Sequence, residues 1–571
     1  MTDRPIPDMN VNKDTDTNPN VNMNMNINTA AEVNPTQQGI PQQVYRPQGV
    51  PMQAAAQPIP QPMQTPQPVP QAYKPPKRVF TSAESVFGLC CILLGYLFVK
   101  LVLAGGLGVG TLVFFSAFMI ISGIFAKKSA VKTSKHSVIY AALTIAFSLC
   151  FLISSNGFIK TLDLLFVMTL AALWSFSLNN PAYKGSDDSF VFTFFSAILG
   201  KPFSEFGSCP AAVSSLVGKS KGGKNIGYIL IGLLIALPVT IISGLLLISA
   251  DRFFSEMMES LFSSAGEKLI INGFQIVIGI PAAFFIFGML FSAAKNRTDS
   301  KLNYESCANI RRSFRISPPV VMYSSVMPLC LIYVMFFISQ ISYFISAFQN
   351  KLPEEYSMAE YARKGFFELF AVAVINLLVI IFINLLCRSN TNDDSRPRFL
   401  KVLTSLLSVF TLVLIATAVS KMVMYIKTFG LTRLRVYTTW FMALLAVLFL
   451  LIIIRQAAKI NLAKTGAVAF TVMFAALSFC NIDLQITRYN IYAYTSGMVE
   501  EFDANHLRKL SDDAVYAVVP LLDSSDETLR DAAEQYFEDR YFDGELTESN
   551  DWRRFNFPGY YACEQSMLQN I

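Results

Sequence analysis

The chain has 571 residues, of which 53% are hydrophobic and 15% are charged, against about 25% charged residues in ordinary soluble domains. This composition excludes a protein that is mainly disordered, collagenous or a disulfide scaffold, and it argues against a string of soluble domains. The formal net charge of +6 says little until the chain is divided into its parts.

The N-terminal residues 1–78 form a low-complexity segment that contains 15 of the 27 prolines and is rich in Asn, Gln and Met. Such a segment cannot bury enough apolar surface to offset its chain entropy, so we expect a disordered tail with polyproline-II character. The tail is either a spacer or a docking site for a protein partner that recognises extended Pro-rich peptide.

Apolar runs of membrane-spanning length recur from Val86 onward and define a transmembrane domain over residues 79–482. A helix needs about 20 apolar residues to cross ~30 Å of hydrocarbon. We therefore predict an all-α, polytopic bundle in a lipid bilayer, whose first span is an uncleaved signal anchor. The predicted spans, about eleven in number, are residues 86–103, 107–126, 137–154, 161–178, 226–250, 269–293, 317–347, 366–387, 402–425, 437–454 and 466–482. The run at 190–199 is too short to cross and is predicted to be interfacial.

The loops between the predicted spans indicate an orientation, because Lys and Arg are enriched on the cytoplasmic side of a membrane. If the N-terminus is inside, the inner segments carry 25 Lys and Arg and the outer loops carry 9. This alternation predicts a cytoplasmic N-terminus and an extracytoplasmic C-terminus. The oligomeric state stays open.

The C-terminal residues 483–571 differ in charge from everything before them. They contain 18 Asp and Glu and 7 Lys and Arg, a net charge of −11, so the rest of the chain carries +17. We predict a small acidic helical domain outside the membrane, where its charge argues against nucleic-acid binding. Ser524 and Glu527 form a capping-box pattern, and residues 512–522 predict another short helix. The helix that follows the capping box has an apolar face of Leu529, Ala532, Ala533, Tyr536 and Phe537.

Polar side chains within apolar spans are costly, so each is a candidate for function. Lys421, near the end of the ninth span, either snorkels to the interface or points into a polar cavity and pairs with Glu368. Asn376 either bonds to a neighbouring helix or contributes to a solute site. Asp163 is expected at the membrane interface. Prolines interrupt three successive spans, either as simple kinks or as breaks that line a transport cavity, at Pro238, Pro281 and Pro328.

Three stretches of the chain carry a family resemblance. They are Glu360–Ala373 with Asn376, Lys421–Arg435 with Phe441 and Met442, and Asn481–Asn490 followed by Leu510–Ala514. Together they resemble the bacterial multi-pass membrane proteins of domain-of-unknown-function family 4173, which is related to family 4153. The resemblance implies a polytopic protein of the bacterial cell membrane with no assigned activity, and it supplies no catalytic or binding residues.

One candidate polar site gathers at the outer ends of spans eight to eleven. Its residues are Glu360, Arg363, Glu368, Asn376, Lys421, Arg433, Arg435, Asp483 and Arg488. They form either an outward-facing functional site capped by the acidic domain, or a salt-bridged interface that docks this domain to the membrane part.

The remaining chemistry of the sequence does not favour an enzyme. The two histidines, His136 and His506, lie far apart, and the sequence contains no Walker-type loop, metal-ligand cluster or cofactor motif. We therefore predict no metal and no cofactor. Transport or translocation of a small solute or lipid predicts a cavity that reaches Glu368 and Lys421. The alternative, a sensor or an envelope assembly protein, predicts a tightly packed bundle.

Overall fold

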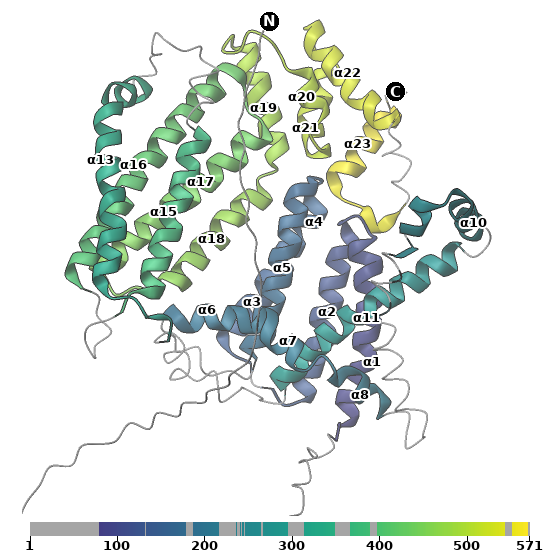
Figure 1. Cartoon of the computed structure of the whole chain (residues 1–571). Helices are drawn as coiled ribbons and strands as arrows, with labels where there is room; N and C mark the ends of the chain where they lie inside the picture. Colours follow the sequence, from purple (N-terminus) through teal and green to yellow (C-terminus); the bar gives the residue numbers. More distant parts are fainter. Residues whose placement is uncertain are drawn as a thin grey trace, which may run out of the picture. The chain divides into compact units, whose positions relative to one another are not determined.

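The computed structural model describes residues 79–131, 133–178, 187–215, 246–263, 267–294, 313–348, 366–388, 397–542 and 551–568, with residues 236, 240, 243 and 244. All of them belong to one compact unit, Lys77–Ile571. Its elements are helices, so the all-α fold is confirmed (Figure 1). The predicted N-terminal tail lies outside the described residues.

The first bundle is built from the N-terminal helices together with one later helix. Its members are α1 (Ser82–Leu97), which continues as a π-helical turn at Phe98–Leu103, α2 (Val109–Lys128), α3 (Lys135–Ser148), α4 (Cys150–Ile153), α5 (Gly157–Ser177) and α11 (Glu267–Ala294). α1 packs along α11 and α3 along α5. The α1–α11 contact depends on two glycines, because a Cβ on Gly95 would lie 2.1 Å from the carbonyl oxygen of Gly279.

Shorter helices surround this bundle. They are α6 (Asp187–Phe195), α7 (Lys201–Ser204), α8 (Ser208–Ser214) and α10 (Arg252–Ser263). α7 and α8 pack against α11, and α8 also packs against α1. The run at 190–199, predicted to be too short for a span, lies in α6 and in the π-helical turn Ser196–Gly200 that follows it.

The second bundle has its own hydrophobic core. It consists of α13 (Pro319–Phe348), α15 (Phe366–Leu386), α16 (Arg398–Phe429) and α17 (Arg433–Ala457). The other three helices all pack against α16. α18 (Leu462–Phe479) connects the bundles, since it packs against α17 and also places Phe474 and Leu477 in the core of the first bundle.

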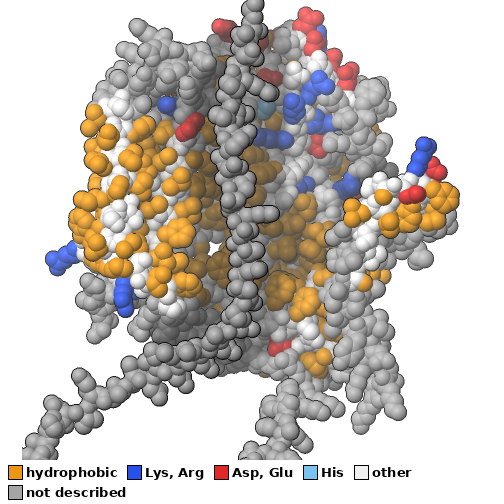
Figure 2. All heavy atoms as spheres, in the orientation of Figure 1, with side chains coloured by type: hydrophobic (Ala, Val, Ile, Leu, Met, Phe, Trp, Pro, Cys, Tyr) orange, Lys and Arg blue, Asp and Glu red, His pale blue; other side chains and the backbone are white. Residues whose placement is uncertain are grey.

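Within the described part of the chain, ten helices are long and apolar enough to cross a membrane. They coincide with ten of the predicted spans, and the remaining one, residues 226–250, lies mostly outside the described residues. α11 and α13 continue through Pro281 and Pro328, so of the two predicted alternatives the helix break does not apply to these two prolines, and Pro238 lies outside the described residues. A proline removes only one backbone hydrogen bond, and neighbouring helices compensate for it in a membrane. Figure 2 shows hydrophobic side chains covering the flank of the second bundle, as a lipid-facing surface requires.

The C-terminal segment, residues 482–568, has a third core of its own. Its helices are α19 (Ile482–Thr495), α20 (Ala504–Arg508), α21 (Val515–Val518), α22 (Glu527–Phe542) and α23 (Phe557–Leu568). The predicted apolar face of α22 is confirmed, because all five of its residues are at most 3% exposed. The predicted cap is wrong by two residues. The Asp526 carboxylate accepts from the Leu529 backbone N–H, so Asp526 rather than Ser524 caps the helix.

Candidate functional site

The C-terminal segment packs onto one end of the membrane-spanning helices, which we call the docked end. This end carries the turns before α5, between α16 and α17, and between α18 and α19, at Asn156, Gly430 and Asn481. α19 packs against α17, and α23 packs against α4. Charged side chains gather around the segment, in contrast to the apolar flank below it (Figure 2).

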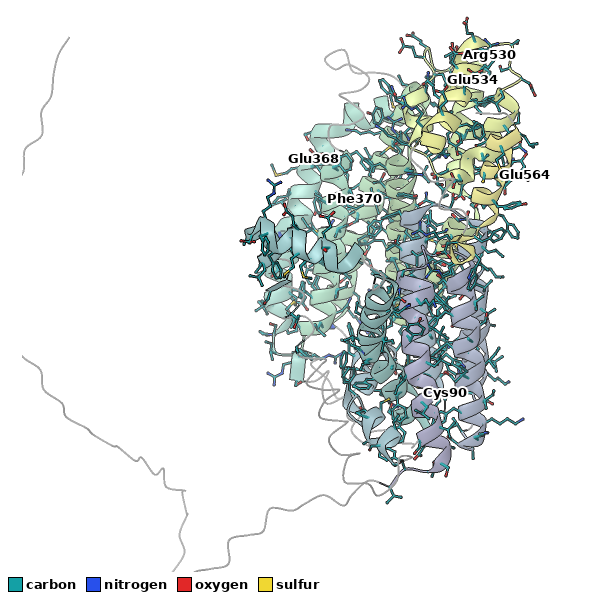
Figure 3. All side chains as sticks on the ribbon, turned by 90° about the vertical axis from the view of Figure 1, so that its right-hand side faces the viewer. Cys90, Glu368, Phe370, Arg530, Glu534 and Glu564 are labelled. Atoms are coloured by element: carbon teal, nitrogen blue, oxygen red, sulfur yellow. The ribbon has the colours of Figure 1, made fainter. Side chains whose placement is uncertain are left out.

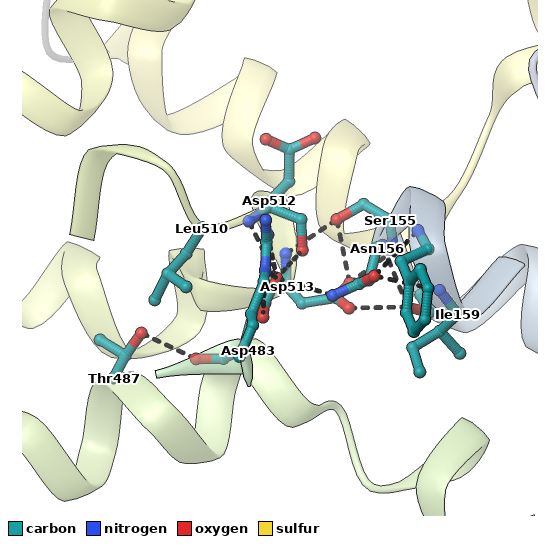
Figure 4. Close-up of polar contacts among 12 residues, drawn as sticks. Ser155, Asn156, Ile159, Asp483, Thr487, Leu510, Asp512 and Asp513 are labelled. Atoms are coloured by element: carbon teal, nitrogen blue, oxygen red, sulfur yellow. Dashed lines mark hydrogen bonds and ion pairs between the residues drawn. The ribbon is translucent and has the colours of Figure 1, made fainter. Parts of the chain in front are cut away.

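Asp483, in the first turn of α19, is the centre of a buried polar network at the docked end and is 0% exposed (Figure 4). The Nε of Arg433 donates to both of its carboxylate oxygens, at 2.8 and 3.1 Å, and Nη2 donates to Oδ2. The backbone N–H and hydroxyl of Ser511 donate to Oδ2 at 3.0 and 2.6 Å. Burial by itself would raise the pKa of Asp483, but the bonds and charge of Arg433 and the bonds from Ser511 hold it below its usual value.

Asp513 is a second buried carboxylate at the docked end, also 0% exposed. Its oxygens accept from the Ser154 hydroxyl at 2.7 Å and from the Ser155 backbone N–H and hydroxyl at 2.6 and 3.0 Å. These donors are all neutral, so burial has the larger effect and raises the pKa of Asp513. The contact joins the C-terminal segment to the first bundle, just before α5 begins.

Asn156 connects the two carboxylate networks. Its side-chain oxygen accepts from the backbone N–H groups of Phe158 and Ile159, both at 3.1 Å, and so caps α5. Its amide nitrogen donates to Asp483 Oδ2 at 3.1 Å and to the Tyr437 hydroxyl at 3.0 Å. A single buried side chain therefore joins α5 of the first bundle, α17 of the second bundle and α19 of the C-terminal segment.

The turn between α16 and α17 is held by a second asparagine. Gly430 has φ 73° and ψ −176°, a conformation that is essentially restricted to glycine. The Asn490 amide accepts from the Leu431 backbone N–H at 2.6 Å and donates to its carbonyl at 2.9 Å. Arg435 donates to the carbonyls of Phe429 and Gly430 and stacks over the Tyr425 ring at 4.1 Å. Arg435 therefore caps the end of α16 and does not enter the Asp483 network.

The end of the chain contacts the first helical hairpin as well. Arg553 is held by Asp551 and donates to the Lys100 carbonyl at 2.9 Å. The Val109 backbone N–H donates to the Phe555 carbonyl at 2.9 Å. A Cβ on Gly108 would lie 2.3 Å from the Arg554 carbonyl carbon, so the glycine allows this close approach.

The structure divides the predicted polar site. It brings Arg433 and Asp483 together, and it leaves Arg488 exposed on α19. Asn376 is 0% exposed and lies in the second bundle, where it accepts from Tyr333 at 2.6 Å and donates to Thr411 at 2.9 Å. It thus bonds α13, α15 and α16 together, which is the interhelical alternative.

Two further predicted residues, Glu368 and Lys421, form no hydrogen bond or ion pair with Asp483. Glu368 is exposed on α15 (Figure 3), Lys421 is half-buried on α16, and their predicted pairing stays a prediction. Glu360 and Arg363 lie outside the described residues. A cavity of about 30 Å³ at the docked end is lined by residues of the α16 end and the C-terminal segment, including Phe429, Asn490 and His506. It has room for about one or two water molecules, and neither Glu368 nor Lys421 lines it.

Sequence reasoning missed several members of the network, namely Ser154, Ser155, Asn156, Ser511 and Asp513. The signal at Asn156 was present, since a polar Ser-Ser-Asn-Gly stretch between two apolar runs is typical of a helix N-cap. Asp163, which was predicted to lie at the membrane interface, lies about two turns inside α5 and is 0% exposed within the protein. It is buried because α3, α4 and α18 pack around α5.

The geometry of the docked end supports binding and positioning. Among the residues that the structure describes, no group of three or more His, Cys, Asp and Glu side chains could hold a metal ion. The buried acids are occupied by hydrogen bonds from serine, asparagine and arginine, an arrangement that fixes one segment onto another.

The helices and their apolar flanks define the class first: this is a multi-pass helical membrane protein. Residues 141–521 match the model of the family described as domain of unknown function (DUF4153), and the chain belongs to this family. The resemblance drawn from the sequence named family 4173 first and family 4153 beside it, and the match is to family 4153. Comparisons with curated proteins and with solved structures find no match.

Proposed function

We propose that the chain is a non-enzymatic membrane protein that senses or assembles something outside the membrane through its acidic C-terminal segment. The observation that supports this function is the attachment of the segment to both bundles by buried polar contacts. Asp483 reaches α17 of the second bundle through Arg433, and Asp513 reaches the first bundle through Ser154 and Ser155. A change in the segment would therefore act on both bundles.

In this proposal the protein lies in a bacterial cell membrane, with a cytoplasmic tail at 1–78, a transmembrane domain at 79–482 and an extracytoplasmic domain at 483–571. A closer affiliation with family 4173 is part of the same proposal. The charge pattern supports this orientation, because the segments on the tail's side carry 25 Lys and Arg and the opposite loops carry 9.

Cysteine labelling in intact cells tests the orientation. Cys480 is exposed and lies at the docked end, next to Asn481. A membrane-impermeant maleimide is expected to label the wild type and to lose this labelling in Cys480→Ser. Labelling of Cys480 only after the cells are permeabilised would place the docked end inside and contradict the proposal.

The acidic surface of the C-terminal segment favours a basic partner. Glu534 lies on α22, where it pairs with Arg530 at 4.0 Å, and the exposed Glu564 lies on α23 (Figure 3). The exposed acids Asp531 and Glu538 add to this surface. With a net charge of −11 over residues 483–571, the segment attracts cationic protein surfaces.

The partner test combines photo-crosslinking with charge reversal. A crosslinker at Tyr492, which is 62% exposed, is expected to capture a specific protein from native membranes. Reversing Asp531, Glu534 and Glu538 to Lys should abolish the capture while the docked end stays protected from protease. Reversing the charge of Arg488, on the C-terminal segment outside this acidic patch, is the matched control. Capture that survives the triple reversal would contradict the proposed surface.

Transport of a small solute or lipid is the second candidate. It is supported by the separate cores of the two bundles, since two independently packed bodies can move against each other. It ranks second because the cavity at the docked end does not reach Glu368 or Lys421. A solute or lipid that raises the unfolding temperature of the wild type, but not that of Lys421→Met, would favour transport.

A further inference from the structure

Asp163 differs from the other buried acids of the chain. It lies on α5 below the Asn156 cap, inside a membrane-spanning helix, and it is 0% exposed. Among the residues that the structure describes, no N–H or O–H group donates to its carboxylate oxygens, and the Cys150 thiol is the one side chain that can bond to them. An ionised carboxylate without donors, held away from water, is strongly unfavourable, whereas the protonated acid is a modest cost.

The polar groups near Asp163 form a path to the docked end. Cys150 of α4 lies beside Asp163, and its thiol donates to the Ser478 carbonyl of α18 at 3.4 Å. A thiol has one hydrogen, so it can be given either to Ser478 or to Asp163. The Ser478 hydroxyl is buried and also lacks a partner within the described part of the chain.

Lys160 continues this path toward the C-terminal segment. It is 4% exposed and lies on α5 about one turn closer to the docked end than Asp163. While α18 contributes the groups of Ser478, the titratable groups on the path are Cys150 from α4, Lys160 from α5, and Asp512 and Asp513 from the C-terminal segment. The path links the buried carboxyl to the network that holds the docked end.

We propose that Asp163 is a proton-binding site inside the membrane-spanning part. It binds and releases its proton from the docked end, past Cys150 and Lys160. The carboxyl takes up one proton from water at the docked end and returns the same proton there, so no other bond is made or broken. While protonated, the carboxyl can donate to a neighbouring acceptor. When it is ionised, the Cys150 hydrogen can turn from Ser478 to Asp163. This inference goes beyond the proposed function and does not depend on it.

Infrared spectroscopy of the full-length protein in lipid nanodiscs, with ¹³C-labelled aspartate, tests the proposal. A protonated aspartic acid gives a carbonyl stretching band that ionised carboxylates do not give. The wild type at neutral pH is expected to show this band, and Asp163→Asn is expected to lose it. The exposed acid Asp531 supplies the matched control, since Asp531→Asn should keep the band. The spectrum of Asp513→Asn shows how much of the carbonyl band comes from Asp513, the other buried acid near the docked end.

Three outcomes would overturn the proposal. The first is a band whose intensity is the same in Asp163→Asn as in the wild type. The second is a band that changes when sodium chloride replaces choline chloride at constant pH and no longer does so in Asp163→Asn, which would make the ligand a metal cation. If Asp163→Asn does not fold, Cys150→Ala decides: a shift of the wild-type band supports the site, and an unchanged band is the third contradicting outcome.

Discussion

Asp483 and Asp163 are both 0% exposed, yet they lie in opposite surroundings. Asp483, at the docked end, accepts bonds from Arg433, Asn156 and Ser511. Asp163, about two turns down α5, has no N–H or O–H donor among the described residues, and only the Cys150 thiol lies beside it. A buried acid with a full set of donors stabilises an interface, whereas a buried acid without donors is kept for another reason. The comparison separates the docked end, where Asp483 holds segments together, from the inside of α5, where we propose that Asp163 binds a proton.

The largest expected effect comes from breaking the Asp483 network. Asp483→Asn leaves the Arg433 guanidinium without its buried counter-charge, and we expect a loss of about 3 kcal/mol of stability. Proteolysis of the C-terminal segment and thermal unfolding in detergent measure it. The exposed Arg488 lies on the same helix, and Arg488→Ala should stay within about 0.5 kcal/mol of the wild type. An equal effect of the two substitutions would remove the distinction between interface and surface.

A smaller loss of stability is expected from a substitution in the turn that precedes Arg433. Gly430→Ala forces a side chain into a glycine-only conformation, with its Cβ 2.7 Å from Asn490 Oδ1, and should cost about 2 kcal/mol. Gly123 on α2 is the control, because a Cβ added there would have no atom within 4 Å and Ala favours the helix. Thermal unfolding of both variants gives the difference. If Gly430→Ala is as stable as Gly123→Ala, the turn does not position Arg433.

Replacing Asn376 extends the comparison to the second bundle. Asn376→Leu removes the bonds to Tyr333 and Thr411, and about 1 kcal/mol should be lost, at ~0.6 kcal/mol for each interhelical bond. Asn384 on the same helix is a matched control, since its side-chain oxygen has no partner among the described residues. Asn384→Leu is therefore expected to be neutral or stabilising. The reverse order of the two unfolding temperatures would contradict this interpretation of Asn376.

The pH dependence of stability sharpens the contrast between the two acids of the docked end. The pKa of Asp513 is raised by burial, so its contribution is present below about 3.9, the ordinary pKa of an Asp, and is lost as the pH rises through the folded value. The pKa of Asp483 is lowered, so its contribution is present above the ordinary value and lost as the pH falls through the folded value. Unfolding temperatures should be measured at pH values below and above about 3.9. Asp513→Asn should lose the fall in stability with rising pH that Asp513 causes, and it should keep the fall with decreasing pH that Asp483 causes. An unchanged profile in Asp513→Asn would contradict the assignment.

The sequence predicted the elements whose signal is local. Long apolar runs predicted the spans, and spacing along one helix predicted that Tyr536 and Phe537 would be buried. Contacts between distant parts of the chain were harder to predict. The bond between Ser154 and Asp513 joins residues 359 positions apart, and no local pattern indicates it. Arg433 and Asp483 were predicted to lie together only because of their places in the chain. Arg433 comes just before the tenth predicted span and Asp483 just after the eleventh, so both lie on the same side of the membrane.

Asp163 is a second case in which contacts between distant parts of the chain could not be predicted from the sequence. Its position near the start of a span predicted an interfacial side chain, which is the usual place for an acid there. Its burial depends on α3, α4 and α18, and α18 begins about three hundred residues later in the chain. Only the assembled helices show that this carboxyl is shielded from water.

The contact between Arg553 and the Lys100 carbonyl spans 453 residues, almost the whole described chain. The helices can enter the membrane one after another during synthesis, but the turn between α1 and α2 receives its cover from residues made about 450 positions later. Assembly of the docked end therefore has to wait until the residues around Arg553 have been made. A ribosome that stalls, or a truncation before residue 551, would release a chain with its spans in place and the first turn uncovered, which gives quality-control proteases a means to tell finished molecules from unfinished ones.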